Sequence, residues 1–576
     1  MSPFRRVLIF ACLALGSTLT AQTQRTTTQP QQKPPSTTTE ETYTAPVTAE
    51  TDKDVSNPNA LKLSLADAIR MSAAQNLGVT IQRYDWAEAG QSLREAYGPF
   101  DWFATADVEH SSNQAPTTSQ FQSSGRRQTF IDLGVSQLLP TGGTYNIGIN
   151  NSRTVTTGGG TLVSPAFGSS LSLGLDQPLL RNFGMDISRR QITIARNTFG
   201  INNEEFRRIL INTVVSVEQA YLNLVYARRF VDVQKEALFL ARDQARITQI
   251  RINVGASAPL DILQPRVQIA TTEEALIAAV ASVRDAEDQL RALLNLPQDE
   301  WDRPIVPTDP VTYTPMTIDV AGSVARAFDL RPELRENQLV TANARVQYLY
   351  ARNQVLPKLD ALVNYTAAGI GGHSAIIDPA TDQIVGFDDT GLPHAIGQVL
   401  GNRFPSWTVG FQVGVPILNI GARAEAKRAE LEVDRTRAVE DQTRQTIALD
   451  VRNTARAIDT AAKEITATRT AREAAEQNLD AERKRYENGM TTIFQVLQIQ
   501  QQLSDARARE LQALVSYNQA VSSYHRAVGD LLDVRNIQVQ QETVPEPNIP
   551  TFRFFDRYSW LNFDDQPKSQ PEGQKK

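Results

Sequence analysis

The chain has 576 residues, of which 58 are lysine or arginine and 64 are aspartate or glutamate, so its formal net charge is −6. This length allows several domains, and an acidic balance without a basic block argues against nucleic acid as a partner. The one continuous apolar run, residues 7–16, is far shorter than the roughly 20 residues that a membrane-spanning helix needs. The composition therefore excludes a protein that crosses a membrane with several helices.

The N-terminus has the pattern of an export signal. Arg5 and Arg6 precede the apolar run and Ala21 provides a small residue for cleavage, so we expect residues 1–21 to be a signal peptide. Acylation at Cys12, the only cysteine of the chain, is the alternative. A signal of this type directs the protein to a periplasm or beyond.

Two polar tails flank the part of the chain that we expect to fold. Threonine, glutamine and proline dominate residues 22–58, which we interpret as a disordered linker because this composition buries too little apolar surface. Residues 536–576 form a second, proline-rich tail. Its aromatic side chains either dock on the folded body or a lipid interface, or belong to a loosely packed segment.

The segment between the tails is an internal repeat. The sequence that begins at Arg251 matches the sequence that begins at Arg485 at a constant offset of 234 residues. An earlier match pairs residues 65–69 with residues 320–324 at an offset of 255 residues, so the first copy is the longer one. Duplication of this kind usually gives pseudo-symmetric packing around an axis. We assign the two repeats to residues 59–309 and 310–535.

Each repeat is predicted to contain a long helical hairpin. Residues 422–488 contain neither glycine nor proline, which predicts a helix of about 100 Å. Apolar residues within it recur at spacings of three and four, as in a coiled coil. Charged residues on it, such as Glu473 and Glu476, are interpreted as its solvated face. The hairpins are assigned to residues 186–296, reversing around Gly255, and to residues 422–528, reversing at Gly489.

Six further segments show partial alternation of apolar and polar residues. Such alternation suits strands with lipid on one side and water on the other, while a soluble sheet that covers a core is the alternative. The context of an export signal and very long helices favours membrane strands. The predicted strands are residues 102–110, 129–138, 144–153, 169–175, 359–365 and 407–415.

Four or six strands in one chain cannot close a barrel. An open sheet edge within a bilayer leaves backbone groups unpaired, at several kcal/mol each, so the chain must form an oligomer. Three copies with four strands each would give 12 strands, and three copies with six would give 18. The turn at residues 140–143 joins the additional hairpin of the first repeat, and the sequence leaves open whether this hairpin, residues 129–153, enters the barrel.

Several short motifs, in a fixed order, carry a family resemblance. Together with the turn at Gly489 they resemble the TolC-type outer-membrane efflux protein family, and the resemblance covers both repeats from about residue 60 to residue 532. The motifs are LSLADAI at residues 63–69, LDQPLL at 175–180, VGASAPLDIL at 254–263, RPEL at 331–334 and VGVPI at 413–417.

The resemblance implies an α+β membrane protein with a TolC-like fold. Such a protein is a homotrimer whose short β-barrel lies in the lipid of the outer membrane of a Gram-negative-type bacterium. Its long helices form a coiled-coil tunnel through the periplasm. The implied partners are a periplasmic adaptor protein, which docks on the ends of the helical hairpins, and an inner-membrane pump or ABC exporter. The resemblance implies no cofactor and no metal site.

In that family a tyrosine and an aspartate near the hairpin turns hold the resting channel shut. The resemblance places this pair at Tyr486 and Asp261, and it places an arginine of the family pattern at Thr491. Two aspartates that ring the family's aperture correspond to Gln495 and Gln498. Because an amide ring does not attract cations as a carboxylate ring does, a plugging metal cation is not expected here. The alternative is that Tyr486 packs along the coil and Asp261 caps a helix.

The same resemblance assigns an adaptor-docking surface to the ends of the two hairpins. We expect it to include residues from both turns and from the helices that flank them. These residues are Arg251, Gly255, Ser257, Leu263, Arg485, Gly489, Thr491 and Leu497.

The sequence gives no support for catalysis, so the protein is not expected to be an enzyme. Its four histidines are scattered and no cysteine cluster, nucleophile motif or phosphate-binding loop is present. The favoured function is a passive exit channel for efflux or type I secretion, opened at its periplasmic end by an adaptor. The alternative is a structural envelope spacer or adhesin with no passage through it.

Overall fold

The computed structural model describes residues 58–119, 122–158, 163–377, 379 and 383–538. All of them belong to one compact unit of the chain. The predicted signal peptide with Cys12, nearly all of the predicted linker and the tail beyond residue 538 lie outside the described residues.

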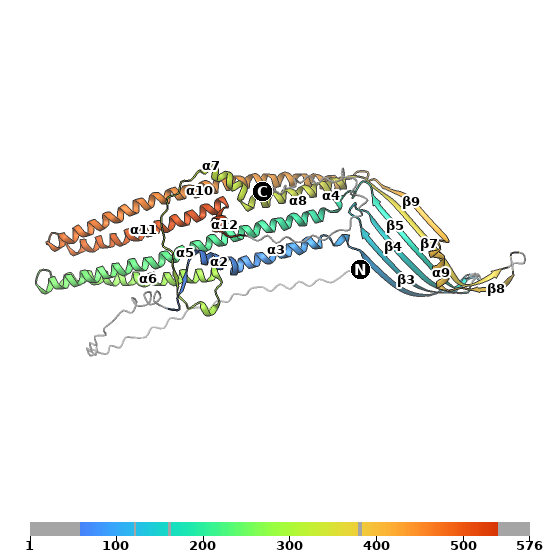
Figure 1. Cartoon of the computed structure of the whole chain (residues 1–576), viewed down its shortest axis with the longest axis horizontal. Coiled ribbons are helices and arrows are strands. Elements are labelled where there is room, and N and C mark those ends of the chain that lie inside the picture. Colours follow the sequence, from blue (N-terminus) through green and yellow to red (C-terminus); the bar gives the residue numbers. More distant parts are fainter. Residues whose placement is uncertain (1–57, 120–121, 159–162, 378, 380–382, 539–576) are drawn as a thin grey trace, which may run out of the picture. The chain divides into compact units, whose positions relative to one another are not determined.

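Two long helical hairpins dominate the described part of the chain (Figure 1). The first consists of α5 (Arg190–Asn253) and α6 (Leu263–Leu294), and the second of α10 (Ile420–Glu487) and α11 (Ile493–Val528). Helix α10 has 68 residues, which corresponds to about 100 Å. These are the long hairpins that the sequence predicts, and α11 packs against α5 as well as against α10.

Two of the shorter helices, α3 and α8, pack beside α5 and α10. Helix α3 contacts α5, and α8 contacts both α10 and α5. Capping side chains fix the start of α3 and of α7: the Asn76 carboxamide oxygen accepts from the backbone N–H of Gly78 and Val79, and Asp319 caps α7. The shorter helices are α2 (Leu65–Gln75), α3 (Leu77–Glu95), α4 (Met185–Ser188), α7 (Val320–Leu330), α8 (Pro332–Gln354), α9 (Leu392–Leu400) and α12 (Leu531–Val534), with 3-10 turns at Gly98–Phe100, Pro259–Ile262 and Gln298–Glu300.

All six predicted strand segments fall in one antiparallel sheet. The strand order is β2-β3-β4-β5-β7, and both β8 and β9 pair with β7. The hairpin β3–β4, which the sequence left unplaced, lies in the middle of this sheet, between β2 and β5. The strands are β2 (Phe103–Gln114), β3 (Gly125–Leu138), β4 (Thr144–Thr157), β5 (Val163–Pro178), β7 (Lys358–Ile377), β8 (Ile384–Asp389) and β9 (Phe404–Gly414).

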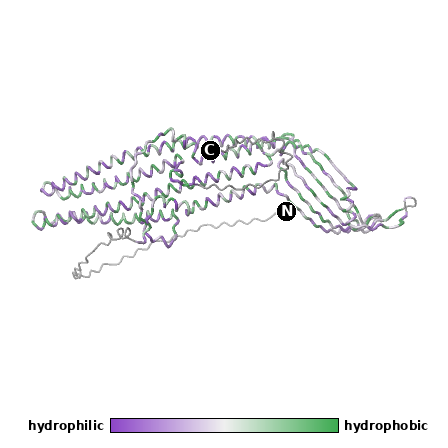
Figure 2. Tube along the Cα trace, in the orientation of Figure 1, coloured by the Kyte–Doolittle hydropathy of each residue, from purple (hydrophilic) through white to green (hydrophobic). Residues whose placement is uncertain are grey.

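The pairing register gives the sheet one apolar face. Cross-strand partners point to the same side, and one such row runs Ala106, Leu133, Ile149, Leu171 and Ala367. The row beside it, on the opposite face, is polar and includes asparagine and serine side chains. Hydrophilic and hydrophobic residues accordingly follow one another along the strands (Figure 2). The alternation is the one expected of strands with lipid on one side and water on the other.

The largest apolar core lies where α5 and α6 meet a small parallel sheet, β1 (Leu61–Leu63) with β6 (Ile305–Pro307). The Tyr221 hydroxyl donates to the carbonyl oxygen of Leu63 at 3.1 Å, and burial raises the pKa of Tyr221 to about 12. Among the described helices, none has the length and apolar character that a membrane span requires.

Candidate functional site at the hairpin ends

The two hairpin turns have the same backbone geometry. Gly255 and Gly489 both adopt a positive φ, 75° and 74°, which side chains disfavour and glycine adopts freely. The carbonyl of Arg251 accepts from Ala256 N at 2.8 Å, and the carbonyl of Arg485 accepts from Met490 N at 2.9 Å. The repeat seen in the sequence is therefore a repeat in structure at the turns.

A single arginine joins the two hairpins near these turns. Arg251 Nη1 on α5 donates to the carbonyl oxygen of Tyr486 on α10 at 2.7 Å. Its guanidinium carbon also lies 4.5 Å from the centre of the Tyr486 ring, within the range of a cation–π contact. The Tyr486 side chain is only 7% exposed and packs with Leu479 and Val496. Tyr486 is thus fixed in the hairpin α10–α11, here named the inner hairpin, and Arg251 holds it to the hairpin α5–α6, here named the outer hairpin.

Asp261 has a local partner instead of Tyr486. Its Oδ2 accepts from Ala258 N at 3.0 Å, in the 3-10 turn that precedes α6. Within the part of the chain that the structure describes, no hydrogen bond joins Asp261 to Tyr486. The expected tyrosine–aspartate contact is therefore not formed in this protomer, because the Tyr486 ring faces Arg251 and an apolar cluster while the carboxylate satisfies its own turn.

The other predicted gate residues lie on or just before α11. Gln495 and Gln498 are exposed, and Thr491 is half-buried. The predicted docking residues are mixed in their surroundings: Gly255, Gly489 and Leu263 are exposed, Ser257 is half-buried, Arg485 donates to Glu482 at 3.3 Å, and Arg251 is engaged with Tyr486.

A groove with apolar walls runs between α6 and α11 beside the turns. Leu263, Val267 and Phe494 are large exposed apolar side chains on its sides. Leu497, which is predicted to be a docking residue, is 6% exposed; it lines the groove and packs in the hairpin core. Gln264, Gln268, Gln498 and Gln501 complete the lining.

A comparison with known protein families identifies the family of this chain. The sequence profile described as outer membrane efflux protein matches residues 126–296 and 324–530, which is more than half of the chain. The chain belongs to the outer membrane efflux protein family. It is an outer-membrane efflux channel, with its strands at the outer membrane and its helical part in the periplasm.

Solved outer-membrane channels have the same fold. The channel OprN is 15% identical, with a TM-score of 0.58, over 83% of this chain and 91% of its own. CmeC from Campylobacter jejuni is 14% identical (TM-score 0.58; 83% and 87% covered), and MtrE from Neisseria gonorrhoeae, solved in an open state, is 15% identical (TM-score 0.55; 82% and 91% covered). No curated protein matches the chain in sequence. The family and these solved proteins are channels rather than enzymes.

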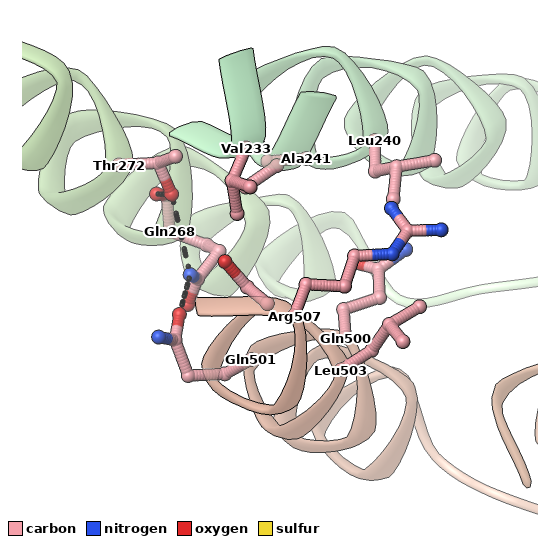
Figure 3. A pocket seen from close by; sticks show the side chains of 11 residues that line it. Val233, Leu240, Ala241, Gln268, Thr272, Gln500, Gln501, Leu503 and Arg507 are labelled. Carbon is pink, nitrogen blue, oxygen red and sulfur yellow. Dashed lines mark hydrogen bonds between the residues drawn. The ribbon is translucent and has the colours of Figure 1, made fainter. Parts of the chain in front are cut away.

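Next to the groove, on the side away from the turns, this efflux protein has a polar layer between the two hairpins. Gln268 Nε2 donates to Gln501 Oε1 at 3.3 Å, from α6 to α11, and also to Thr272 (Figure 3). Gln500 and Arg507 line the same small pocket together with apolar residues of α5, among them Val233 and Leu240. The hydrogen bond between Gln268 and Gln501 forms only when the two hairpins are correctly aligned along their axes, so it helps to fix their relative position.

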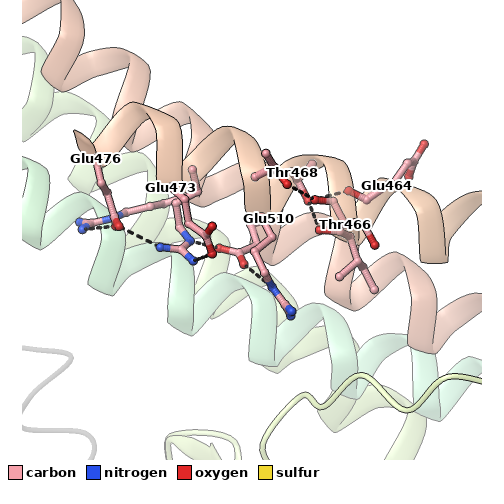
Figure 4. Close-up of polar contacts among 11 residues, drawn as sticks. Glu464, Thr466, Thr468, Glu473, Glu476 and Glu510 are labelled. Carbon is pink, nitrogen blue, oxygen red and sulfur yellow. Dashed lines mark hydrogen bonds and ion pairs between the residues drawn. The ribbon is translucent and has the colours of Figure 1, made fainter. Parts of the chain in front are cut away.

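A network of charges continues the contact away from the turns. Arg507 on α11 pairs with Glu236 on α5 at 2.6 Å and with Glu476 on α10 at 3.0 Å. Arg472 pairs with Glu476 at 2.9 Å and with Glu510 at 2.5 Å (Figure 4). Glu476 is therefore more than the solvated charge that the sequence predicted, because it links α10 to the arginine that reaches α5.

The network predicts a loss of stability in acid. Burial alone would raise the pKa of Glu476, but hydrogen bonds and charge from Arg507 and Arg472 outweigh it and lower the pKa. A carboxylate with a lowered pKa stabilises the fold above its ordinary pKa, and this stabilisation disappears as the pH falls through the lowered value. We expect the temperature at which the helices of wild type melt to fall as the pH drops from about 6 to about 3. The melting temperature of Glu476→Gln should fall less over the same range. Glu464→Gln changes an exposed glutamate of the same helix outside this network and should behave like wild type, and equal pH dependence in all three proteins would contradict the assignment.

Proposed function

We propose that the protein works as a homotrimeric passive duct whose resting state is closed at the ends of the helical hairpins. The contact of Arg251 with Tyr486 carries the proposal, because it ties the outer hairpin to the inner hairpin beside both turns. Helix α5 places this contact about 90 Å along its own axis from the sheet. Closing a duct at that end leaves its membrane part free of moving elements.

The narrowest ring of the closed duct is assigned to Gln495, together with Gln498 at the edge that α11 shares with the groove. Both amides are exposed on α11, close to the turn at Gly489, and Thr491 and Asp261 lie beside the same turns. Three copies of neutral amides offer hydrogen bonds and steric narrowing without an electrostatic trap for cations. We therefore expect the closed state to depend little on divalent metal ions.

The proposed partners are a periplasmic adaptor protein and an inner-membrane pump or ABC exporter. The groove between α6 and α11 presents Leu263, Val267 and Phe494 beside the exposed turns, so it suits the apolar face of a helix from an adaptor. In this proposal the adaptor separates Arg251 from Tyr486 as it docks, and the pump supplies the energy. Efflux of small molecules and type I secretion of proteins both fit such a duct.

Planar-bilayer recordings of the purified trimer test the duct. We expect small, infrequent conductance steps from wild type, because the hairpin ends are closed, and a response that changes little when divalent cations are chelated. Intact trimers that give no steps, in wild type and in variants without the Arg251 contact, would overturn the duct and favour the structural spacer.

The groove predicts a variant that is defective only in assembly with the adaptor. Phe494→Asp puts a charge on the apolar wall, so we expect adaptor capture and efflux to fall at least tenfold while trimer content stays unchanged. Leu431→Asp is a matched control, because Leu431 is 58% exposed against 57% for Phe494 and lies on α10 far from the turns. Normal capture by Phe494→Asp would show that the adaptor docks elsewhere.

A further inference from the structure

The first repeat contributes four long strands to the sheet, and the second repeat contributes two. They are β2, β3, β4 and β5 from the first repeat and β7 and β9 from the second. Strand β3 pairs with β2 along all 12 residues of β2 and with β4 along 14 residues, and β4 continues to β5. The hairpin β3–β4 is thus hydrogen-bonded on both sides. Strand β2 lies outside the residues that match the family profile, which begin at residue 126.

The added strands have the same two faces as the others. Leu133 is paired with Ile149 and Val108 with Ile131, so the apolar face of β5 and β4 extends onto β3 and β2. These four side chains are exposed in the single chain. On the opposite face of the same strands Asp107 is paired with Asp132. A hairpin that lay outside the membrane would present this apolar face to water, whereas within a barrel wall it meets lipid.

The two edges of the six long strands complement each other. Strands β2 and β9 are exposed along nearly their whole length, and successive strands of the sheet are antiparallel. With six strands, β2 and β9 run in opposite directions, so β9 of one copy meets β2 of the next in antiparallel orientation. Strand β8 does not block this edge, because it pairs only with residues 373–377, beyond the part of β7 that pairs with β9.

We propose that three copies close an 18-stranded barrel, with six strands from each chain and with β9 of one copy paired to β2 of its neighbour. The proposal rests on the trimer of the proposed function and specifies its membrane interface. Barrel diameter grows roughly in proportion to strand number, so this barrel is about one and a half times as wide as a 12-stranded one, and it leaves an aqueous channel. Its cargo is then limited by the hairpin ends, and solutes too bulky for a 12-stranded barrel can leave.

The faces also fix the register of the new interface. Because a slip of one residue turns every side chain to the other face, the apolar residues of β9 must pair with the apolar residues of β2. On β9 these are Trp407, Val409 and Phe411, and on β2 they are Ala104, Ala106 and Val108.

Cross-linking of paired cysteines in outer membranes tests the strand order. The only native cysteine, Cys12, lies in the predicted signal peptide, so introduced thiols can be linked selectively by a short bismaleimide. We expect Val409→Cys to link to a neighbouring subunit when combined with Ala104→Cys, Ala106→Cys or Val108→Cys. Ile149→Cys with Leu171→Cys is the positive control within one chain, because these residues are direct partners on β4 and β5.

Two further pairs separate the alternatives. A link between Ala106→Cys and Leu171→Cys would place β2 next to β5 and expel β3–β4 from the wall, since the proposed order separates them by about 14 Å. A link between subunits from Ile149→Cys to Val409→Cys would make β4 the edge and also overturn the proposal. If the variants do not assemble, counting strands by electron cryomicroscopy of the unmodified trimer gives the answer. A trimer with 12 strands refutes this inference alone, whereas a chain that forms no trimer refutes the proposed function as well.

Discussion

Replacing Arg251 with alanine is expected to open the channel. The variant loses a charge-assisted hydrogen bond to the Tyr486 carbonyl and a cation–π contact with its ring. Such a hydrogen bond contributes about 1.5–3 kcal/mol, and the ring contact adds to it. A loss of about 2 kcal/mol in each protomer favours opening by roughly thirtyfold. We expect the open probability in planar bilayers to rise by about tenfold or more.

Variants at and near this contact isolate its effect. Arg246→Ala removes an arginine from the same helix whose partner, Asp243, is its own neighbour at 2.7 Å, so the conductance should stay at the wild-type level. Arg251→Lys keeps the charge and loses the planar fork, which predicts an intermediate open probability. Asp261→Ala tests the alternative that Asp261 holds the channel closed. If this variant raised the open probability more than Arg251→Ala does, the aspartate would be the residue that closes the channel.

The sequence repeat located both turns, but it could not show which side chains meet there. Arg251 and Arg485 are equivalent in the repeat and have the same backbone geometry, yet Arg251 reaches Tyr486 whereas Arg485 turns to Glu482. The two arginines differ because each hairpin contacts the other with one face only. Arg251 lies on the contacting face, whereas Arg485 pairs within its own helix. A pattern read along one chain contains no information about which face of a hairpin meets its neighbour.

The strands illustrate a similar limit. Alternation identified the segments of all six long strands, because a lipid-facing row requires large apolar side chains. It underestimated their length, since the outer half of β7 (residues 366–373) is rich in glycine and alanine and carries little alternation. Whether residues 129–153 joined the sheet depended on pairing with strands elsewhere in the chain. Only the register with β2 and β5 shows that they do.

Buried charge was the feature that the sequence concealed most completely. The spacing of Arg284, Glu287 and Arg291 is typical of ion pairs on a wet helix face. In the structure Glu287 is fully buried and Arg291 is 4% exposed. Glu287 also pairs with Arg228 on α5 at 2.6 Å and accepts from Ile305 N at 3.2 Å. One carboxylate therefore joins both helices of the outer hairpin to the small sheet β1–β6.

Replacing Glu287 with alanine is expected to unfold this junction locally. Removing one member of a buried ion pair costs about 3–5 kcal/mol, because the remaining charges stay buried without a partner. Here Arg228 loses its ion-pair partner and the N–H of Ile305 loses its acceptor. Arg291 loses Glu287 but keeps Asp288 at 2.7 Å. The cost corresponds to more than a hundredfold increase in local opening. Hydrogen exchange of residues 303–307 and 61–63 should rise by at least that factor.

Two controls make this result specific to the buried charge. Glu274→Ala changes an exposed glutamate on the same helix, and exchange at β1 and β6 should stay as in wild type. Glu287→Gln retains the side-chain shape and an acceptor for Ile305 N but loses the negative charge, so its effect should be smaller than that of alanine and still large. Unchanged exchange in both Glu287 variants would mean that apolar packing around Tyr221 and Leu224 holds the junction without the charge.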